Sequence, residues 1–166
     1  MKHTELTDED IQRIAAAVAQ TPGITTRKMK PKRKNHEKRM VYEYLTHAYP
    51  NQLQWKNVRV GAIKPSEFGK MYAFLRRWAD AIVVTKKEVV IIEGKIKPNA
   101  GVISQLQLYM QLFPSTPEFK MVAHMPVRGE IVSVFRDELV DKMAEDAGLT
   151  TVIYEPTFMA EIMENI

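Results

Sequence analysis

The segment RRWADAIVVTKKEVVIIEGKIK, residues 76–97, restricts the possible folds of this chain more than any other stretch. Its two apolar runs flank a short charged turn at 86–87, a pattern that predicts a buried β-hairpin over roughly 78–97. Each run nevertheless contains one acidic residue, Asp80 in the first and Glu93 in the second. Carboxylates are rarely buried without a partner, so these two require an explanation.

A symmetric hairpin closed at 86–87 brings the two acids together. In that register Val84 lies opposite Val89, and Asp80 lies opposite Glu93. Side chains alternate between the two faces of a strand. One face is therefore expected to carry Trp78, Asp80, Ile82, Val84, Val89, Glu93 and Lys95. Directly opposed residues have Cβ atoms about 4.5–5.5 Å apart, and like charges at that separation repel each other.

Two neighbouring carboxylates are a suitable site for a divalent cation. Mg²⁺ binds one or two carboxylates, keeps several waters and takes phosphate oxygens as further ligands. A cation between Asp80 and Glu93 would offset their repulsion and lower the pKa of a bound water, which Lys95 would position or deprotonate. This combination predicts metal-assisted phosphodiester hydrolysis. In the structural alternative, both acids lie at a sheet edge and form salt bridges with Arg77 or Lys95.

Together with this hairpin, the chain from 35 to 154 predicts elements in the order α, β, β, β, α, β, α, β. The expected helices cover 7–20, 35–48, 100–113, 135–147 and 157–166, and the further expected strands cover 53–63, 119–125 and 150–154. This order indicates an α/β fold with a mixed central β-sheet flanked by helices. We expect an N-terminal helix and basic arm over 1–34 and the main domain over 35–166.

Basic residues gather in the segment 27–39, which holds eight Lys or Arg and one acid. Such a run is either a solvated linker or an arm whose charges are neutralised by phosphates. The absence of cysteine excludes disulfides, thiolate metal sites and cysteine nucleophiles. No apolar stretch approaches the roughly 20 residues that a membrane helix needs, and the polar N-terminus does not resemble a signal peptide. A cytoplasmic location without membrane contact is the expectation.

The arrangement of Asp80 and Glu93-Gly94-Lys95 resembles the PD-(D/E)XK nuclease superfamily. That family has an acid on one core strand and acid-x-Lys on the next, within a restriction-endonuclease-like core. Ala79 stands where the eponymous motif has proline.

The helix after the hairpin adds a second likeness to this family. Its residues Gln105-Leu106-Gln107-Leu108-Tyr109 look like the Q-h-x-x-Y motif of the RecB-type and lambda-exonuclease-type branches. Gln105 and Tyr109 lie on one helix face, as they would also in an ordinary amphipathic helix. The family further places a Glu on the helix before the sheet. Glu37 fits because it shares the apolar face of the helix over 35–48, and Glu43 is the second choice.

The resemblance implies a Mg²⁺-dependent nuclease acting on DNA, with Mn²⁺ as a substitute ion. Asp80, Glu93 and Glu37 would hold the metal, Lys95 would serve the water, and Gln105 and Tyr109 would support the site. The DNA-binding residues would be Arg27, Lys28, Lys30, Lys32, Arg33, Lys34, Lys38, Arg39, Arg76 and Arg77. So short a chain leaves little room for a sequence-recognition domain. Exonuclease and endonuclease remain open, as does DNA against RNA.

The alternative is a binding or structural protein that has the same fold and catalyses no reaction. Small nuclease-like proteins of this kind resemble phage head-completion or neck components and other DNA-binding assembly parts. A homo-oligomer, a larger nucleoprotein or a virion would then be the setting. The intact acids and lysine argue against a purely structural role, which would not require them.

Overall fold

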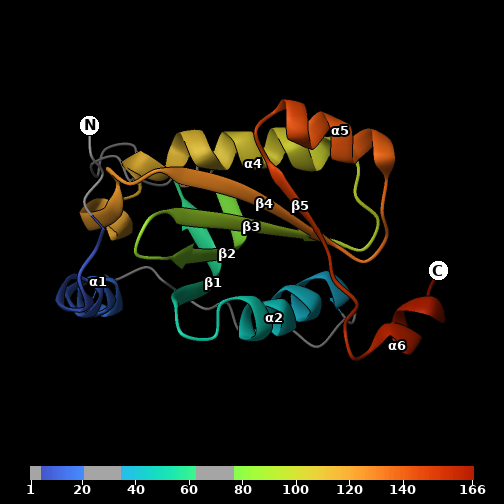
Figure 1. Cartoon of the computed structure of the whole chain (residues 1–166), viewed down its shortest axis with the longest axis horizontal. Helices are drawn as coiled ribbons and strands as arrows, with labels where there is room; N and C mark the ends of the chain where they lie inside the picture. Colours follow the sequence, from blue (N-terminus) through green and yellow to red (C-terminus); the bar gives the residue numbers. More distant parts are fainter. Residues whose placement is uncertain (1–4, 21–34, 63–76) are drawn as a thin grey trace, which may run out of the picture.

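The computed structural model describes residues 5–20, 35–62 and 77–166, which form a five-stranded mixed sheet with helices on both faces. The strands follow the chain order across the sheet (Figure 1): β1 (Leu53–Val60), β2 (Arg77–Val84), β3 (Val89–Lys95), β4 (Val127–Ser133) and β5 (Thr150–Ile153). The pairs β1–β2 and β2–β3 are antiparallel, whereas β3–β4 and β4–β5 are parallel. The predicted α/β fold with a mixed, helix-flanked sheet is confirmed.

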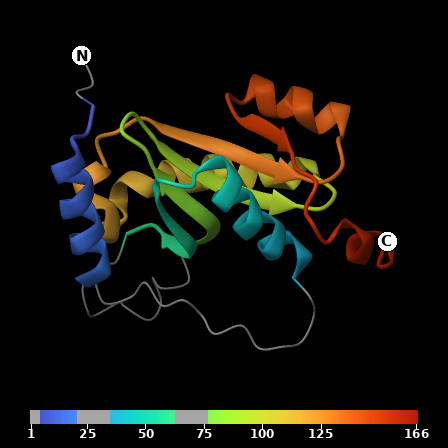
Figure 2. The ribbon, with the colours of Figure 1, turned by 60° about the horizontal axis from the view of Figure 1, so that its bottom comes forward.

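Helices cover the two faces of this sheet. Figure 2 shows α2 (His36–Ala48) on one side of the strands and α4 (Ala100–Leu112) on the other. The parallel crossovers pass through α4 and α5 (Glu138–Asp146), while α1 (Asp8–Gln20) and α6 (Met159–Met163) lie near the two chain ends. No helix in the described part of the chain is long and apolar enough to cross a membrane.

Each face of the sheet has its own apolar core. On the α4 face, Ile82, Val84 and Ile91 pack with Leu106 and with residues of α1 and α5. On the α2 face lie Ala81, Val83, Val90 and Ile92, packed against Met40, Val41 and Leu45. Because β3 is covered on both sides, it needs apolar side chains at successive positions. This requirement explains the uninterrupted run Val89–Ile92 in the sequence.

Short polar side chains and one glycine define three of the helix ends. Thr7 and Asp10 exchange the two hydrogen bonds of a capping box, with N–O distances of 3.0 and 3.2 Å. Asn99 accepts a hydrogen bond from the backbone N–H of Gly101 at the start of α4. Gly148, with φ of +72°, follows α5 and takes the left-handed conformation that glycine adopts without a Cβ penalty.

The strand expected at 119–125 is wrong. Residues 119–122 belong to the 3₁₀ helix Pro117–Val122, which follows a shorter one at Phe113–Ser115, and the fourth strand, β4, begins at Val127. Phe119, Val122 and Met125 are buried at intervals of three, which is the period of a 3₁₀ helix and not of a strand.

Candidate active site

The hairpin that carries the two acids has the predicted register. Val84 pairs with Val89 and Ala81 pairs with Ile92, so that the closing turn is centred at 86–87. Away from the turn, the last pair of β2 with β3 is Ala81 with Ile92, and the next residue on each strand is Asp80 or Glu93. The two acids therefore stand at the point where β2 and β3 begin to separate.

The alternation of side chains along β2 is interrupted at this point, which corrects one expectation. Ala79 and Ile82, three residues apart, both lie in the α4-face core. Strict alternation would have placed Ile82 with Trp78 and Asp80 on that face. On β1, Val58 and Trp55 show the same three-residue step, around Asn57 with φ of +52°. The shared face predicted for residues 78–84 is wrong for this reason.

Asp80 lies among groups from α2 and β3. One carboxylate oxygen accepts a hydrogen bond from the backbone N–H of Gly94, at 3.0 Å. Burial raises the pKa of Asp80, and the negative charge of Glu37 adds to this; the Gly94 hydrogen bond and the ammonium groups of Lys95 and Lys38 oppose it. A carboxylate in this position gains from any further positive charge placed beside it.

Glu93 is the most enclosed charged group of the cluster, with 4% of its surface exposed. Its Oε1 accepts hydrogen bonds from the Gln105 side-chain amide at 2.7 Å and from the Lys95 ammonium at 3.3 Å. Its Oε2 is buried and has no hydrogen-bond partner. Burial, and next the charge of Asp80, raise the pKa of Glu93 to about 7, although Lys95 works in the opposite direction. An unpartnered buried carboxylate oxygen is costly, and a bound cation would satisfy it.

The two residues from α4 hold this carboxylate from one side. The Gln105 amide nitrogen donates to Glu93 and also lies 2.6 Å from the Tyr109 hydroxyl. Tyr109 is buried, which raises its pKa to about 12 and keeps the hydroxyl protonated at neutral pH. The expectation that both side chains share one helix face is confirmed by this contact. Together they fix the orientation of Glu93.

Of the two glutamates considered on α2, Glu37 is the one near the cluster. Its Oε1 accepts a hydrogen bond from the backbone N–H of Ile96 at 3.3 Å, just beyond the end of β3. Glu43 instead binds the hydroxyl of Tyr154 and both the backbone and the hydroxyl of Thr157. Glu43 thus anchors the C-terminal segment and lies away from the hairpin acids.

The three-carboxylate metal site of Asp80, Glu93 and Glu37 stays a prediction. In the parts of the chain that the structure describes, no three His, Cys, Asp or Glu side chains are grouped closely enough to hold a metal ion. The remaining pair, Asp80 and Glu93, still fits an ion that takes one or two carboxylates and completes its shell with water and phosphate. Glu37, tied to the backbone, is placed to orient the end of β3.

Seven of the ten predicted DNA-binding residues lie outside the described residues: Arg27, Lys28, Lys30, Lys32, Arg33, Lys34 and Arg76. Arg39 forms an ion pair with Glu161 at 2.9 Å and lies 4.0 Å over the ring of Phe158, which secures α6 to α2. Arg77 begins β2, where its charge reaches the neighbourhood of Tyr109. Lys38 donates a hydrogen bond from Nζ to the Asn57 side-chain oxygen at 2.8 Å.

Two features of the α2 face were missed from the sequence. Glu130 of β4 is buried and accepts hydrogen bonds from Arg128 at 2.7 Å, Tyr44 at 2.8 Å and Tyr49 at 3.0 Å. Assigning the fourth strand to 119–125 concealed the alternating pattern of β4. Asn57 was missed as well, although the three-residue step from Trp55 to Val58 marks an interruption of the strand period.

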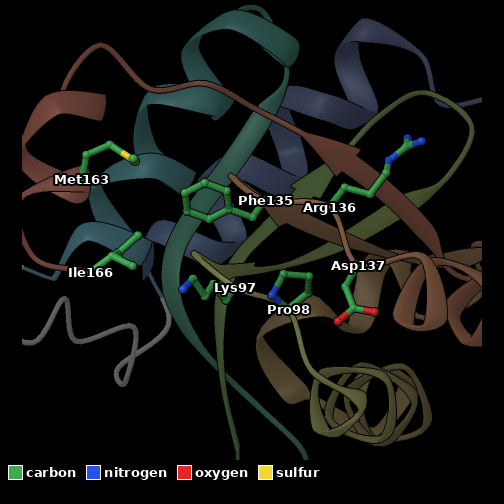
Figure 3. A pocket seen from close by; sticks show the side chains of 7 residues that line it. All are labelled: Lys97, Pro98, Phe135, Arg136, Asp137, Met163 and Ile166. Atoms are coloured by element: carbon green, nitrogen blue, oxygen red, sulfur yellow. The ribbon is translucent and has the colours of Figure 1, made fainter.

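A pocket of about 380 Å³ opens beyond the ends of β3 and β4, two residues after Lys95. In Figure 3 its walls come from three segments: Lys97 and Pro98, Phe135 to Asp137, and Met163 with Ile166. The Lys97 ammonium lies 5.8 Å from the centre of the Phe135 ring. The carboxylate in this wall, Asp137, caps α5 by accepting from the backbone N–H of Val140. Of the residues that line this pocket, Asp137 is the one acid, whereas Asp80 and Glu93 lie at the hairpin.

Neither a family model nor a curated protein matches the sequence. Three solved structures are similar to it at low identity. A repair endonuclease from Pyrococcus abyssi is 20% identical, with a TM-score of 0.42 over 77% of this chain and 50% of that chain. A protein of unknown function is 12% identical, with a TM-score of 0.47 over 70% of this chain and 57% of that one. An EndoMS–dsDNA complex is 14% identical, with a TM-score of 0.44 over 79% and 49%. This chain spans about half the length of these solved chains.

Proposed function

We propose that this chain is a metal-dependent nuclease that hydrolyses phosphodiester bonds in DNA. The observation that carries the proposal is the buried oxygen of Glu93, which has no hydrogen-bond partner and lies next to Asp80 and Lys95. A purely structural ion pair would use Lys95 to satisfy both oxygens, whereas here one oxygen is left for another ligand. The resemblance of Asp80, Glu93 and Lys95 to the PD-(D/E)XK pattern supports the same interpretation.

Asp80 and Glu93 are the residues that would hold the ion, Mg²⁺ or Mn²⁺. When bound, such an ion polarises the phosphate and makes a bound water more acidic. The surrounding groups of the chain fix the two carboxylates beforehand: the backbone N–H of Gly94 binds Asp80, and Gln105 binds Glu93. Preformed contacts of this kind remove the entropic cost of arranging the ligands during the reaction.

Among the described residues, Lys95 forms the ion pair with Glu93, at 3.3 Å, and its side chain is 21% exposed. From there its ammonium reaches a phosphate brought to the carboxylates and stabilises the negative charge that develops on the phosphate oxygens. Removing one such preorganised donor typically slows an enzyme by about 10²–10³-fold. We assign Lys95 this electrostatic role and the orientation of the attacking water.

The test is a cleavage assay on supercoiled plasmid and linear duplex DNA with Mg²⁺, Mn²⁺ or chelator. We expect the wild type to cleave with either metal and not in chelator, and Asp80→Asn and Lys95→Met to lose cleavage by about 10²-fold or more. Lys142→Met, an exposed substitution on α5, is the matched control. Thermal unfolding checks that each variant is folded.

Three outcomes separate the possible functions. Cleavage that persists in both site variants refutes the assignment of the residues. DNA binding without cleavage in either metal favours the alternative of a non-catalytic DNA-binding or assembly protein. Comparing plasmid with end-blocked linear DNA distinguishes an endonuclease from an exonuclease.

A further inference from the structure

The residue opposite Asp80 on the neighbouring strand has an unusual backbone. Lys56 pairs with Ala81 and Val58 pairs with Ala79, so Asn57 lies across from Asp80. Asn57 has φ of +52°, and among the described residues it is the one non-glycine with positive φ. Asparagine tolerates this left-handed conformation better than most residues, but such positions are typically kept where they serve a purpose.

The side chain of Asn57 holds Lys38 in place. Lys38, in the first turn of α2, donates from Nζ to the Asn57 side-chain oxygen at 2.8 Å. The backbone N–H of Lys38 is itself held by the Asn35 cap at 3.1 Å. A long, flexible side chain is thus restrained at both ends.

The partner of this ammonium is neutral. Within the described residues, no ion pair joins Lys38 to a carboxylate. A lysine has three N–H donors, and the amide of Asn57 occupies one without cancelling the charge. The other two donors remain for a ligand, and the positive charge lies near enough to Asp80 to lower the pKa of that carboxyl. Lys95 stands beside Glu93, so each acid of the pair has one lysine near it.

A strip of cations and aromatic rings continues from this point along β1. The Lys56 ammonium lies 4.6 Å from the Tyr42 ring of α2, and the Arg59 guanidinium lies 4.6 Å from the Trp78 ring. Arg59 and Trp78 are cross-strand partners, next to Val58 and Ala79, which point into the opposite core. The interruption at Asn57 is therefore what brings Lys56 and Arg59 to the same face of the sheet.

We infer that Lys38 and Asn57 form a seat for a backbone phosphate adjacent to the one that is cleaved, and that Lys56 and Arg59 continue the path of that strand along β1. The inference rests on the proposed function only in assuming that a neighbouring phosphate is cleaved. The contact itself is a sequence-independent phosphate contact, in which a cation positions the nucleic acid without reading its bases. Asn57 is a positioning residue because it acts through Lys38.

The experiment measures binding of a fluorescent duplex oligonucleotide by anisotropy, in chelator and over a series of salt concentrations. We expect Lys38→Met to weaken binding about tenfold and to reduce the slope of log K against log salt by about one. Asn57→Asp, which gives Lys38 a charged partner, is expected to produce a similar loss. Asn57→Gly keeps the left-handed backbone, removes the amide and is expected to produce a smaller loss.

Lys142→Met is again the control and should leave both affinity and slope unchanged. A methylphosphonate placed at each phosphate in turn locates the contact, since neutralising the right phosphate weakens the wild type but not Lys38→Met. If Lys38→Met binds with the affinity and slope of the control, the proposal is wrong, and it is also wrong if the wild type does not bind DNA. This binding assay needs no cleavage. If the protein binds DNA through Lys38 but never cuts it, the proposed nuclease activity is wrong and the phosphate contact of Lys38 is still supported.

Discussion

The clearest consequence of a buried, unpartnered carboxylate is a pH dependence of folding stability in the absence of metal. The pKa of Glu93 is raised from 4.5 to about 7 in the folded chain. An acid with a raised folded pKa binds its proton more tightly in the native state than in the unfolded state. Its contribution is therefore most favourable below the unfolded pKa and is lost as the pH rises through the folded pKa. In chelator, the wild type should be less stable at about pH 8 than at about pH 5 as far as this group is concerned.

The size of this effect follows from the two pKa values. One pKa unit corresponds to about 1.4 kcal/mol. The raised pKa of Glu93 therefore lowers the free energy of unfolding by at most about 3 kcal/mol at about pH 8 and by about 1 kcal/mol at about pH 5. The difference, about 2 kcal/mol, corresponds to about 4–8 °C in Tm for a chain of this length. Burial raises the pKa of Asp80 too, which acts in the same direction.

The assay compares Tm in chelator at the two pH values for the wild type, Glu93→Gln and the control Glu155→Gln, whose side chain is exposed. Glu93→Gln should be the more stable protein at the higher pH and lose that advantage at the lower one. Mg²⁺ should raise the Tm of the wild type at the higher pH and leave Glu93→Gln nearly unchanged. A wild type whose Tm follows that of Glu93→Gln across the whole range would refute the reasoning, because Glu93 would then carry no unfavourable charge.

Three further perturbations test other contacts of the fold. Gln105→Ala should raise the pKa of Glu93 further and slow cleavage about tenfold with little loss of Tm, measured by single-turnover kinetics. Gly94→Ala should destabilise the chain by about 1–3 kcal/mol in urea unfolding, because a Cβ there would overlap the Val41 side chain of α2. Arg128→Ala leaves the carboxylate of Glu130 buried without its charged partner and should cost about 3–5 kcal/mol, again measured in urea, with no direct effect on metal binding.

Much of the fold was predictable because local physics determined it. The helix caps at Thr7, Asn99 and Gly148 are short-range features, and the hairpin register follows from one turn and two apolar runs. For the same reason, the sequence alone predicts that Asp80 and Glu93 are neighbours. Gln105 and Tyr109 were paired correctly because a helix fixes which residues share a face.

The errors arose where a residue's environment depends on a distant segment. Phe119, Val122 and Met125 are buried in the α4-face core, as strand residues would be, but the backbone forms a 3₁₀ helix up to Val122. The interruption at Asn57 has no strong composition signal, and its consequence for Asp80 exists only through strand pairing. The partner of Lys38, nineteen residues away, is likewise a product of tertiary packing.

The position of the acids follows from the change of pairing along β3. Over Val89–Ile92 this strand has antiparallel β2 on one side and parallel β4 on the other. From Glu93 to Lys95 the pairing with β4 continues, while on the other side the backbone N–H of Gly94 is taken by the carboxylate of Asp80. The chain thus replaces a strand–strand hydrogen bond with a hydrogen bond to a side chain. β3 stays paired with β4 here, and Asp80 of β2 lies beside Glu93 and Lys95 of β3 where the two strands separate. A glycine is required at position 94, between Glu93 and Lys95, because α2 packs directly over it. It follows that lengthening the β2–β3 ladder by one pair would remove the opening between the strands, and with it the proposed metal site, without any change in the acids themselves.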